Sequence, residues 1–241
     1  MQCSVGLQDM KIPIGDPKNI SQQYDDVILY FDEVPLIDER CYQYLLSYTS
    51  NERVRYAQKY KLREDRILSV IAFLILRIGL IDLFGISAMP QLSKTEYGKP
   101  YLEEYPDIHF SFSHCSCGVT CAFSKQSNSV GVDMQDIVKC DHKTARYFMC
   151  DSEYDILLKT RDADRFFTKI WTLKESYGKY METGICYNMR ETNLEREISL
   201  NNLSVSSYDL PEFIVTAVAS VPLKLKRVRI ADIIKFCKSI N

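Results

Sequence analysis

The feature that most constrains the fold is an apolar run, ILSVIAFLILRIGLIDLFG, at residues 67–85. Arg77 and Asp82 interrupt this run, so a buried amphipathic helix is favoured over a segment that spans a bilayer. The chain has 241 residues, of which 46% are hydrophobic. It can therefore bury a sizeable core, either as one large domain or as two closely packed halves.

The charges of the chain nearly cancel, with 30 basic and 32 acidic side chains and a formal net charge of -2. No overall field would draw such a protein to nucleic acid or to an anionic membrane, so an anionic ligand needs a local basic pocket. The first 19 residues contain no continuous apolar segment. They predict neither a secretory signal nor a membrane anchor, and we expect a cytoplasmic protein.

The nine cysteines are odd in number, and their spacing fits no zinc pattern. The nearest set, Cys115, Cys117 and Cys121, falls in a strand-like segment, and free buried thiols are the favoured interpretation. A catalytic Cys115 paired with His114 is disfavoured, because neighbours in a strand point to opposite faces.

The pattern of the first half predicts a strand at residues 27–31 and helices at about 37–48 and 51–79, with Ser50 able to cap the second helix. Three short alternating segments follow, at residues 109–114, 119–124 and 130–135, and they indicate an antiparallel meander.

The helical period returns between residues 142 and 184, and strands are expected at 202–210, 212–220 and 224–233. The order strand, helix, strands thus occurs twice. This recurrence predicts an α+β fold with two halves of similar architecture, at residues 1–129 and 130–241.

Two acidic side chains stand out. On the strand at 130–135, Asp133 and Gln135 share a face with Gly131, opposite three apolar residues, and a solvated aspartate at a strand end is the simpler interpretation. In the helical region after residue 142, a spacing of three and four residues predicts a packed face made of Phe166, Ile170, Leu173 and Tyr177.

Glu175 and Lys179 lie on the stripe beside that packed face, together with Trp171. An exposed Glu175–Lys179 ion pair is one interpretation. The other is a ligand site: a carboxylate flanked by Lys174 and Lys179, near a second carboxylate, can hold Mg²⁺ and a polyphosphate together.

Five motifs in order carry a resemblance to a known family: EYGKP (96–100), FSFSH (110–114), VGVDMQ (130–135), SEY (152–154) and WTLKES (171–176). The set resembles the 4'-phosphopantetheinyl transferases of the surfactin-synthetase-activating type, over residues 51–187. The separation of Asp133 and Glu175 is also similar to that family's.

The resemblance implies transfer of phosphopantetheine from coenzyme A to a serine of an apo acyl or peptidyl carrier protein, with release of adenosine 3',5'-bisphosphate. It also implies a monomer of two pseudo-symmetric halves, each a small antiparallel sheet packed with helices, with coenzyme A between them. A non-catalytic module that binds coenzyme A or a carrier protein is the rival function.

The resemblance also implies residue roles. Mg²⁺ would be held by Asp133 and Glu175, with Gln135 where prototype members carry a third acid. Glu153 matches a general base, for which Glu175 acting through a metal-bound water is the rival, and Lys174 lies near the phosphates. The expected coenzyme A contacts are Arg63, Arg66, Lys99, Ser113, His114, Lys174 and Lys179.

Two of these roles have structural alternatives. Arg63 and Arg66 equally fit a solvated helix face, and His114 fits a strand histidine bonded to backbone. Two further departures from the family are Cys115, where a serine often follows the histidine, and METGICYN at residues 181–188, which lacks the usual glycine-lysine-glycine turn.

Overall fold

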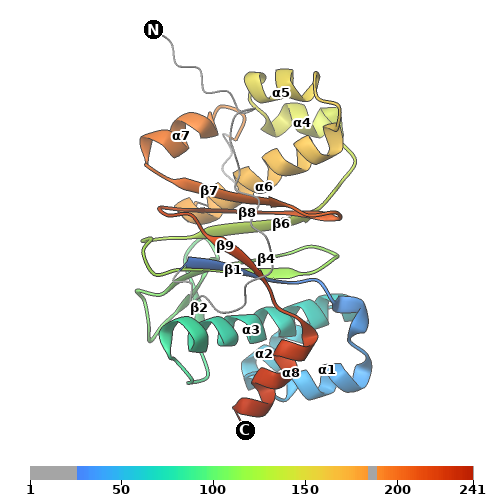
Figure 1. Ribbon diagram of the computed structural model, residues 1–241, viewed down its shortest axis with the longest axis vertical. Coiled ribbons are helices and arrows are strands. Elements are labelled where there is room, and N and C mark those ends of the chain that lie inside the picture. Colours follow the sequence, from blue (N-terminus) through green and yellow to red (C-terminus); the bar gives the residue numbers. More distant parts are fainter. Residues whose placement is uncertain (1–25, 184–188, 241) are drawn as a thin grey trace.

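The computed structural model describes residues 26–183 and 189–240. Two sheets lie face to face in the centre, and helices cover their outer faces, as Figure 1 shows. The α+β prediction is confirmed. The first 19 residues, which predict neither a signal nor an anchor, lie outside the described residues. Residues 184–188, part of METGICYN, also lie outside them.

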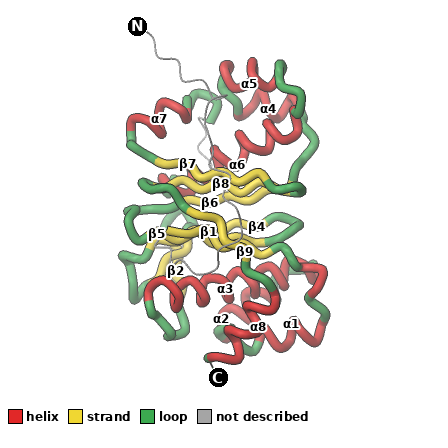
Figure 2. The backbone as a smooth tube through the Cα atoms, in the orientation of Figure 1, coloured by secondary structure: helices red, strands yellow, loops and turns green. Residues whose placement is uncertain are grey.

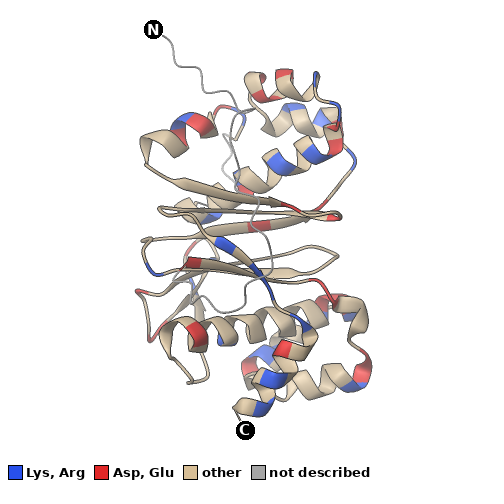
Figure 3. Ribbon diagram, in the orientation of Figure 1, with Lys and Arg blue, Asp and Glu red and all other residues tan. Residues whose placement is uncertain are grey.

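Each helical layer is built mainly from one part of the chain, except that the C-terminal helix returns to the first layer. The first contains α1 (Glu39–Leu46), α2 (Asn51–Ala57), α3 (Arg63–Phe84) and α8 (Ile230–Ser239), with a short 3-10 turn at Val34–Leu36. The second contains α4 (His142–Phe148), α5 (Asp151–Leu157), α6 (Ala163–Met181) and α7 (Leu194–Leu200). Charged side chains of both signs are distributed over both helical layers (Figure 3).

The strands form two main sheets and a small hairpin, drawn in yellow in Figure 2. The first sheet has the order β4-β5-β1-β9, the second β6-β8-β7, and β2 pairs with β3. Their bounds are β1 Asp26–Phe31, β2 Leu92–Lys94, β3 Pro100–Leu102, β4 His109–His114, β5 Val119–Ser124, β6 Gly131–Asp136, β7 Ser204–Asp209, β8 Phe213–Ala219 and β9 Lys224–Arg227.

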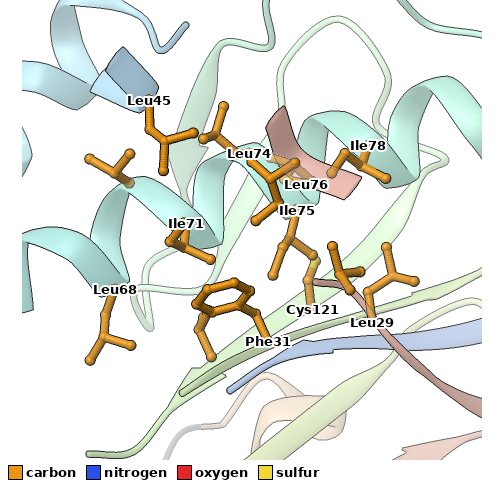
Figure 4. Close-up of a cluster of buried hydrophobic side chains, with 14 of the residues drawn as sticks. Leu29, Phe31, Leu45, Leu68, Ile71, Leu74, Ile75, Leu76, Ile78 and Cys121 are labelled. Carbon is orange, nitrogen blue, oxygen red and sulfur yellow. The ribbon is translucent and has the colours of Figure 1, made fainter. Parts of the chain in front are cut away.

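Helix α3 contains the apolar run and is the core helix of the first layer. Its length and composition would suit a membrane span, but 72% of its most apolar window is buried within the protein. Ile71 and Ile75 are fully buried and point toward Phe31 and Cys121 of the first sheet (Figure 4). The prediction of a buried helix is confirmed, but its amphipathic pattern is wrong, because the helix is buried on nearly every side.

The predicted helix at 51–79 is two helices. Ser50 caps α2, since its hydroxyl accepts a hydrogen bond from Arg53 N at 3.1 Å, as expected. After Ala57 the chain leaves the helix, and α3 begins at Arg63 and continues to Phe84, where Gly85 adopts a left-handed conformation with φ of 69°.

The predicted meander is wrong at its third strand. β4 and β5 pair antiparallel, but β6 pairs with β8, with Asp133 opposite Thr216, and so belongs to the second sheet. Alternation in a sequence specifies the faces of a strand and not its partner. β4 still lies close to β6, because Ser111 Oγ accepts a hydrogen bond from Val132 N at 3.2 Å.

The C-terminal segment returns to the first sheet. β9 pairs with β1 in parallel, so the first sheet is mixed and not purely antiparallel as expected. The strand predicted at 224–233 ends at Arg227, and α8 follows it and packs against α3. The division at residue 129 stays a prediction.

An apolar layer fills the space between the two sheets. Ile28 and Ala122 from the first sheet contact the face of β6 that carries Val132 and Met134, and all four side chains are buried. The apolar face predicted for residues 130–135 thus packs between the sheets, and Asp133 lies on the opposite face, toward α6.

Candidate active site

The site begins with a close approach between β6 and α6. A Cβ atom at Gly131 would lie 1.9 Å from Ser176 O and 2.4 Å from Tyr180 N, so only glycine permits this contact. The buried stripe of α6 is correspondingly small and polar, with Thr168, Thr172 and Ser176 fully buried. The close contact brings Asp133, two residues after Gly131, next to the helix.

The packed face expected for α6 is partly wrong. Ile170 is buried as predicted, but Phe166, Leu173 and Tyr177 are only half-buried. The small polar stripe faces the sheet instead, and Thr172 Oγ1 lies 2.9 Å from Thr216 Oγ1 of β8. Apolar spacing did not reveal this face because its contact depends on small size and hydroxyl pairing.

Asp133 is buried, with 6% of its surface exposed, and one of its oxygens has two partners. Oδ1 accepts a hydrogen bond from Ser113 Oγ at 2.7 Å and an ion-paired hydrogen bond from Lys179 Nζ at 2.8 Å. Lys179 Nζ also donates to Val132 O at 3.0 Å. The solvated aspartate is therefore ruled out, and the Lys179 ammonium pairs with Asp133.

Two carboxylate oxygens at the site lack a partner among the described residues, Asp133 Oδ2 and Glu175 Oε1, and both atoms are buried. Burial raises the pKa of Glu175, the charge of Asp133 raises it further, and Lys179 opposes the shift. Buried carboxylate oxygens without partners are costly, and a hard divalent cation satisfies both at once. The donor set therefore fits Mg²⁺.

The neighbouring polar residues on β6 divide between the two faces. Gln135 is half-buried and follows Asp133 on the same face, where its amide oxygen can serve as a third donor. Asp136 is on the other face and accepts hydrogen bonds from Ser116 N and Cys117 N, at 2.9 and 3.3 Å. Because of its face and these contacts, Asp136 does not replace an acid at position 135.

A pocket of about 310 Å³ opens beside these carboxylates. It is lined by Tyr97, Gly98, Lys99, Pro100, Ser111, Phe112, Glu175, Gly178, Lys179 and Glu182. Lys99 Nζ donates to Ser129 Oγ at 2.9 Å and to Glu182 Oε1 at 3.0 Å. Burial lowers the pKa of Lys99, and Glu182 partly compensates for it. Two cationic side chains and one glutamate from the predicted set thus meet in one cavity.

Lys174 and Glu153 lie together, and neither is among the described residues that line the pocket. Their side chains form a buried ion pair at 2.8 Å, with 2% and 7% of each exposed. Lys174 Nζ also donates to the carbonyl oxygens of Phe148 and Met189, both at 2.7 Å. Glu153 Oε2 accepts from Cys150 N at 2.9 Å, which caps α5. These contacts tie α6 to α5, and the predicted catalytic roles stay predictions.

The remaining predicted contacts are also outside the described lining of the pocket. Arg63 Nη2 donates to Ile37 O at 2.6 Å, and Arg66 Nε donates to Tyr60 O at 2.8 Å, so both guanidinium groups bond backbone. His114 is exposed at the end of β4. Ser113 bonds Asp133 and so belongs to the carboxylate cluster.

Sequence analysis missed several residues of the pocket, chiefly Glu182, Tyr97 and Ser111. Glu182 is the C-cap of α6 and has a left-handed backbone with φ of 58°, which turns the chain toward Lys99. Tyr97 directly precedes the GKP motif, whose neighbourhood was the available signal. Nothing in the sequence around Glu182 pointed to Lys99, 83 residues earlier.

Comparisons with known proteins agree with this site. Residues 129–223 match the 4'-phosphopantetheinyl transferase superfamily, a stretch that contains both β6 and α6. The chain is 34% identical over 161 residues to 4'-phosphopantetheinyl transferase gsp of Aneurinibacillus migulanus, which covers 65% of this chain and 66% of that protein. It is 28% identical over 160 residues to 4'-phosphopantetheinyl transferase Sfp of Bacillus subtilis, with 65% and 70% covered.

A more distant relative is the L-aminoadipate-semialdehyde dehydrogenase-phosphopantetheinyl transferase of Saccharomyces cerevisiae, 28% identical over 124 residues, or 44% of this chain and 45% of that protein. The chain belongs to the 4'-phosphopantetheinyl transferase family, which confirms the resemblance. It matches 66% of the Aneurinibacillus relative, just under two thirds of that protein's length.

Proposed function

We propose that this protein transfers 4'-phosphopantetheine from coenzyme A to a serine of an apo acyl or peptidyl carrier protein, releasing adenosine 3',5'-bisphosphate, and that the transfer requires Mg²⁺. The observation that carries the proposal is a pair of buried oxygens, one from Asp133 and one from Glu175, that no described residue satisfies and that lie beside a pocket with two lysines. Membership of the family supports the same reaction.

Asp133 and Glu175 would hold the ion, and Gln135 would add a neutral third donor. When bound, Mg²⁺ would neutralise charge on the phosphate that departs with the nucleotide. With one negative charge fewer than three acids provide, this site should hold the ion less tightly. The rest of the work is positioning and electrostatic stabilisation of phosphate oxygens.

Two lysines would contact the diphosphate of coenzyme A. Lys179 lies at the pocket and beside Asp133, so its ammonium can neutralise a phosphate oxygen next to the carboxylates. Lys99 lines the same pocket, and Glu182 holds its ammonium there. A bound phosphate would compete with Glu182 for Lys99, because both are anions on one cation.

The contacts of the two glutamates favour Glu175 over Glu153 as the group that accepts the serine proton. Glu175 lines the pocket, where it would act on the serine proton through a water and not directly, because its carboxylate would hold the ion. The Glu153 carboxylate is buried and already bonds Lys174 and Cys150 N. A base must reach the proton that it removes, and Glu153 would first have to leave this ion pair.

The finer fold expectations belong to the same proposal: pseudo-symmetric halves at residues 1–129 and 130–241, and a cytoplasmic monomer. Each sheet has its own helical layer, which supports two similar halves, and β9 and α8 are the parts of residues 130–241 that join the first layer and sheet. Sedimentation of the purified chain tests the monomer, and a dimer at micromolar concentration contradicts it.

The rival is a module that binds coenzyme A or a carrier protein without turnover, an idea that the neutral Gln135 favours. Intact-mass analysis of several apo carriers, incubated with coenzyme A with and without Mg²⁺, separates the two. The enzyme adds one phosphopantetheine to a carrier only when the ion is present. A mass unchanged for every carrier under both conditions identifies a binder and refutes the transferase.

A further inference from the structure

A second cluster of possible metal ligands lies on the turn between β4 and β5. Cys115 N donates to Gly118 O at 3.0 Å, and Gly118 N donates to Cys115 O at 3.4 Å, so Ser116 and Cys117 form the tip of a tight hairpin. A Cβ atom at Gly118 would lie 2.0 Å from Phe31 O, which shows how closely the turn packs against β1. The turn therefore holds both thiols in a fixed place.

Asp136 completes a three-residue group with these thiols. One ligand atom from each of Cys115, Cys117 and Asp136 lies within 4.8 Å of the others. The carboxylate is oriented by the turn itself, since Ser116 N and Cys117 N both donate to it, at 2.9 and 3.3 Å. Backbone bonds that orient a carboxylate in this way are typical of the outer shell of metal sites.

Glu212, on the turn between β7 and β8, supplies a fourth donor. Cys117 Sγ donates to Glu212 Oε2 at 3.9 Å. In a tetrahedral zinc site, with metal–sulfur bonds of roughly 2.3 Å, sulfur and oxygen ligands lie about 3.5 to 3.8 Å apart. The ligand atoms of Cys115, Cys117 and Asp136, which lie within 4.8 Å of one another, need to close by only about 1 Å to reach that spacing, and Glu212 would join them through its contact with Cys117.

We propose that Cys115, Cys117 and Asp136, with Glu212 as the fourth ligand, form a site for a thiophilic divalent cation of the zinc class. Two thiolates favour such an ion over Mg²⁺, which prefers oxygen donors, so this site differs in chemistry from the pair Asp133 and Glu175. It is a second metal site, independent of the proposed transferase reaction.

The ligands come from both sheets. The two cysteines are on the hairpin of the first sheet, whereas Asp136 ends β6 and Glu212 precedes β8 in the second. A bound ion would therefore connect the two sheets and stabilise the folded state by mass action. Cys121, the third cysteine of the sequence pattern, is fully buried in the core near α3 and is not a ligand.

Titration of the reduced, full-length protein with Co²⁺ tests the site. We expect one equivalent to produce the thiolate-to-cobalt charge-transfer band in the near ultraviolet and the visible bands of tetrahedral Co²⁺. Zn²⁺ should remove these bands, and excess Mg²⁺ should not. Cys117→Ser and Asp136→Asn should each weaken Co²⁺ binding by about tenfold or more. Cys41→Ser, a half-buried thiol on α1, is the matched control and should leave binding unchanged.

Alkylation followed by peptide mass analysis provides a readout that needs no variant. Zn²⁺ should slow the modification of Cys117 by about tenfold or more relative to its rate without metal, and leave Cys41 unaffected. The proposal is overturned if one equivalent of Co²⁺ gives no charge-transfer band, or if Cys117→Ser retains the full band. A Cys115–Cys117 disulfide that forms equally fast with and without Zn²⁺ also overturns it.

Discussion

Lys179 Nζ lies 2.8 Å from Asp133 Oδ1, while the second oxygen of the same carboxylate is buried and has no partner within residues 26–183 and 189–240. The protein therefore supplies hydrogen-bond partners to only one oxygen of Asp133, and Oδ2 is available for a cation. Glu175 Oε1 is likewise buried, with no hydrogen-bond partner among the described residues.

Asp133→Asn and Glu175→Gln should each lower the rate of carrier modification by about 10³-fold or more, because loss of the metal removes several kcal/mol of transition-state stabilisation. The far-ultraviolet circular dichroism of both variants should match that of the unchanged protein. Transfer to an apo carrier, followed by intact mass at saturating Mg²⁺, measures the effect. Near-normal transfer in either variant would contradict the proposed metal site.

The pKa of Glu175 predicts how stability depends on pH. Its pKa is raised above the ordinary value of 4.5, mainly by burial and next by Asp133. The folded state then binds this proton more tightly than the unfolded state, so stability falls as the pH rises from about 4.5 to the folded pKa, and is level above it.

Glu175→Gln removes this titration. Without metal, the free energy of unfolding in urea should fall with pH more steeply for the unchanged protein than for the variant, within that window only. Saturating Mg²⁺ at neutral pH should stabilise the unchanged protein and not Glu175→Gln. Parallel curves for the two proteins, with equal responses to Mg²⁺, would contradict the raised pKa.

Gly131→Ala tests the close approach of β6 and α6. The added methyl group would clash with Ser176 O and Tyr180 N, and should destabilise the protein by about 1–3 kcal/mol. Because the helix must shift, stabilisation by Mg²⁺ should also weaken. Thermal unfolding with and without Mg²⁺ measures both effects.

Gly85→Ala is the matched control. Gly85 also resists substitution, since its φ is 69°, but nothing lies within 4 Å of an added Cβ atom. The Gly85→Ala substitution should lower the free energy of unfolding by about 1 kcal/mol and leave the stabilisation by Mg²⁺ unchanged. If Gly131→Ala matched the unchanged protein in both measurements, the proposed contact would be wrong.

The buried ion pair of Glu153 and Lys174 separates a structural role from a catalytic one. Glu153→Gln leaves the Lys174 ammonium without its counter-charge and should destabilise the protein by about 3–5 kcal/mol. The double variant Glu153→Gln, Lys174→Met removes both charges and should recover most of that stability.

Transfer activity of the folded double variant then decides between the two roles. We expect it to keep at least about a tenth of the normal rate, because Glu175 and not Glu153 lines the pocket. A stable double variant without activity would support Glu153 as the general base, or Lys174 as a phosphate contact.

Much of the site was predictable because local pattern carries it. Alternation placed Asp133 and Gln135 on one face of a strand, and helical spacing placed Glu175 and Lys179 on one stripe. The motifs identified the family. A helix over the apolar run was also predicted, because few arrangements can bury so long an apolar run, but its start and end were not.

Other features depend on contacts that no local pattern contains. The motifs that contain Lys174 and Glu153 indicated chemistry, but these two side chains form an ion pair in the interior and are not in the described lining of the pocket. Lys174 also donates to Phe148 O, 26 residues earlier in the chain. No sequence pattern predicted the partner strand of β6 or the left-handed backbone at Glu182 either. Alternation gives no strand order, and the spacing of charges gives no distance in space.

The sequence by itself determined the family, the α+β class, the faces of the strand that carries Asp133 and the helix that carries Glu175. These follow from short-range periodicity and from motif order. Only the tertiary structure decided that β6 leaves β5 to pair with β8, that Gly131 lets α6 approach, and that Asp136 meets two thiols. Those outcomes depend on close packing between segments distant in the chain, where the fit of backbones and the need to satisfy buried polar groups select the neighbours.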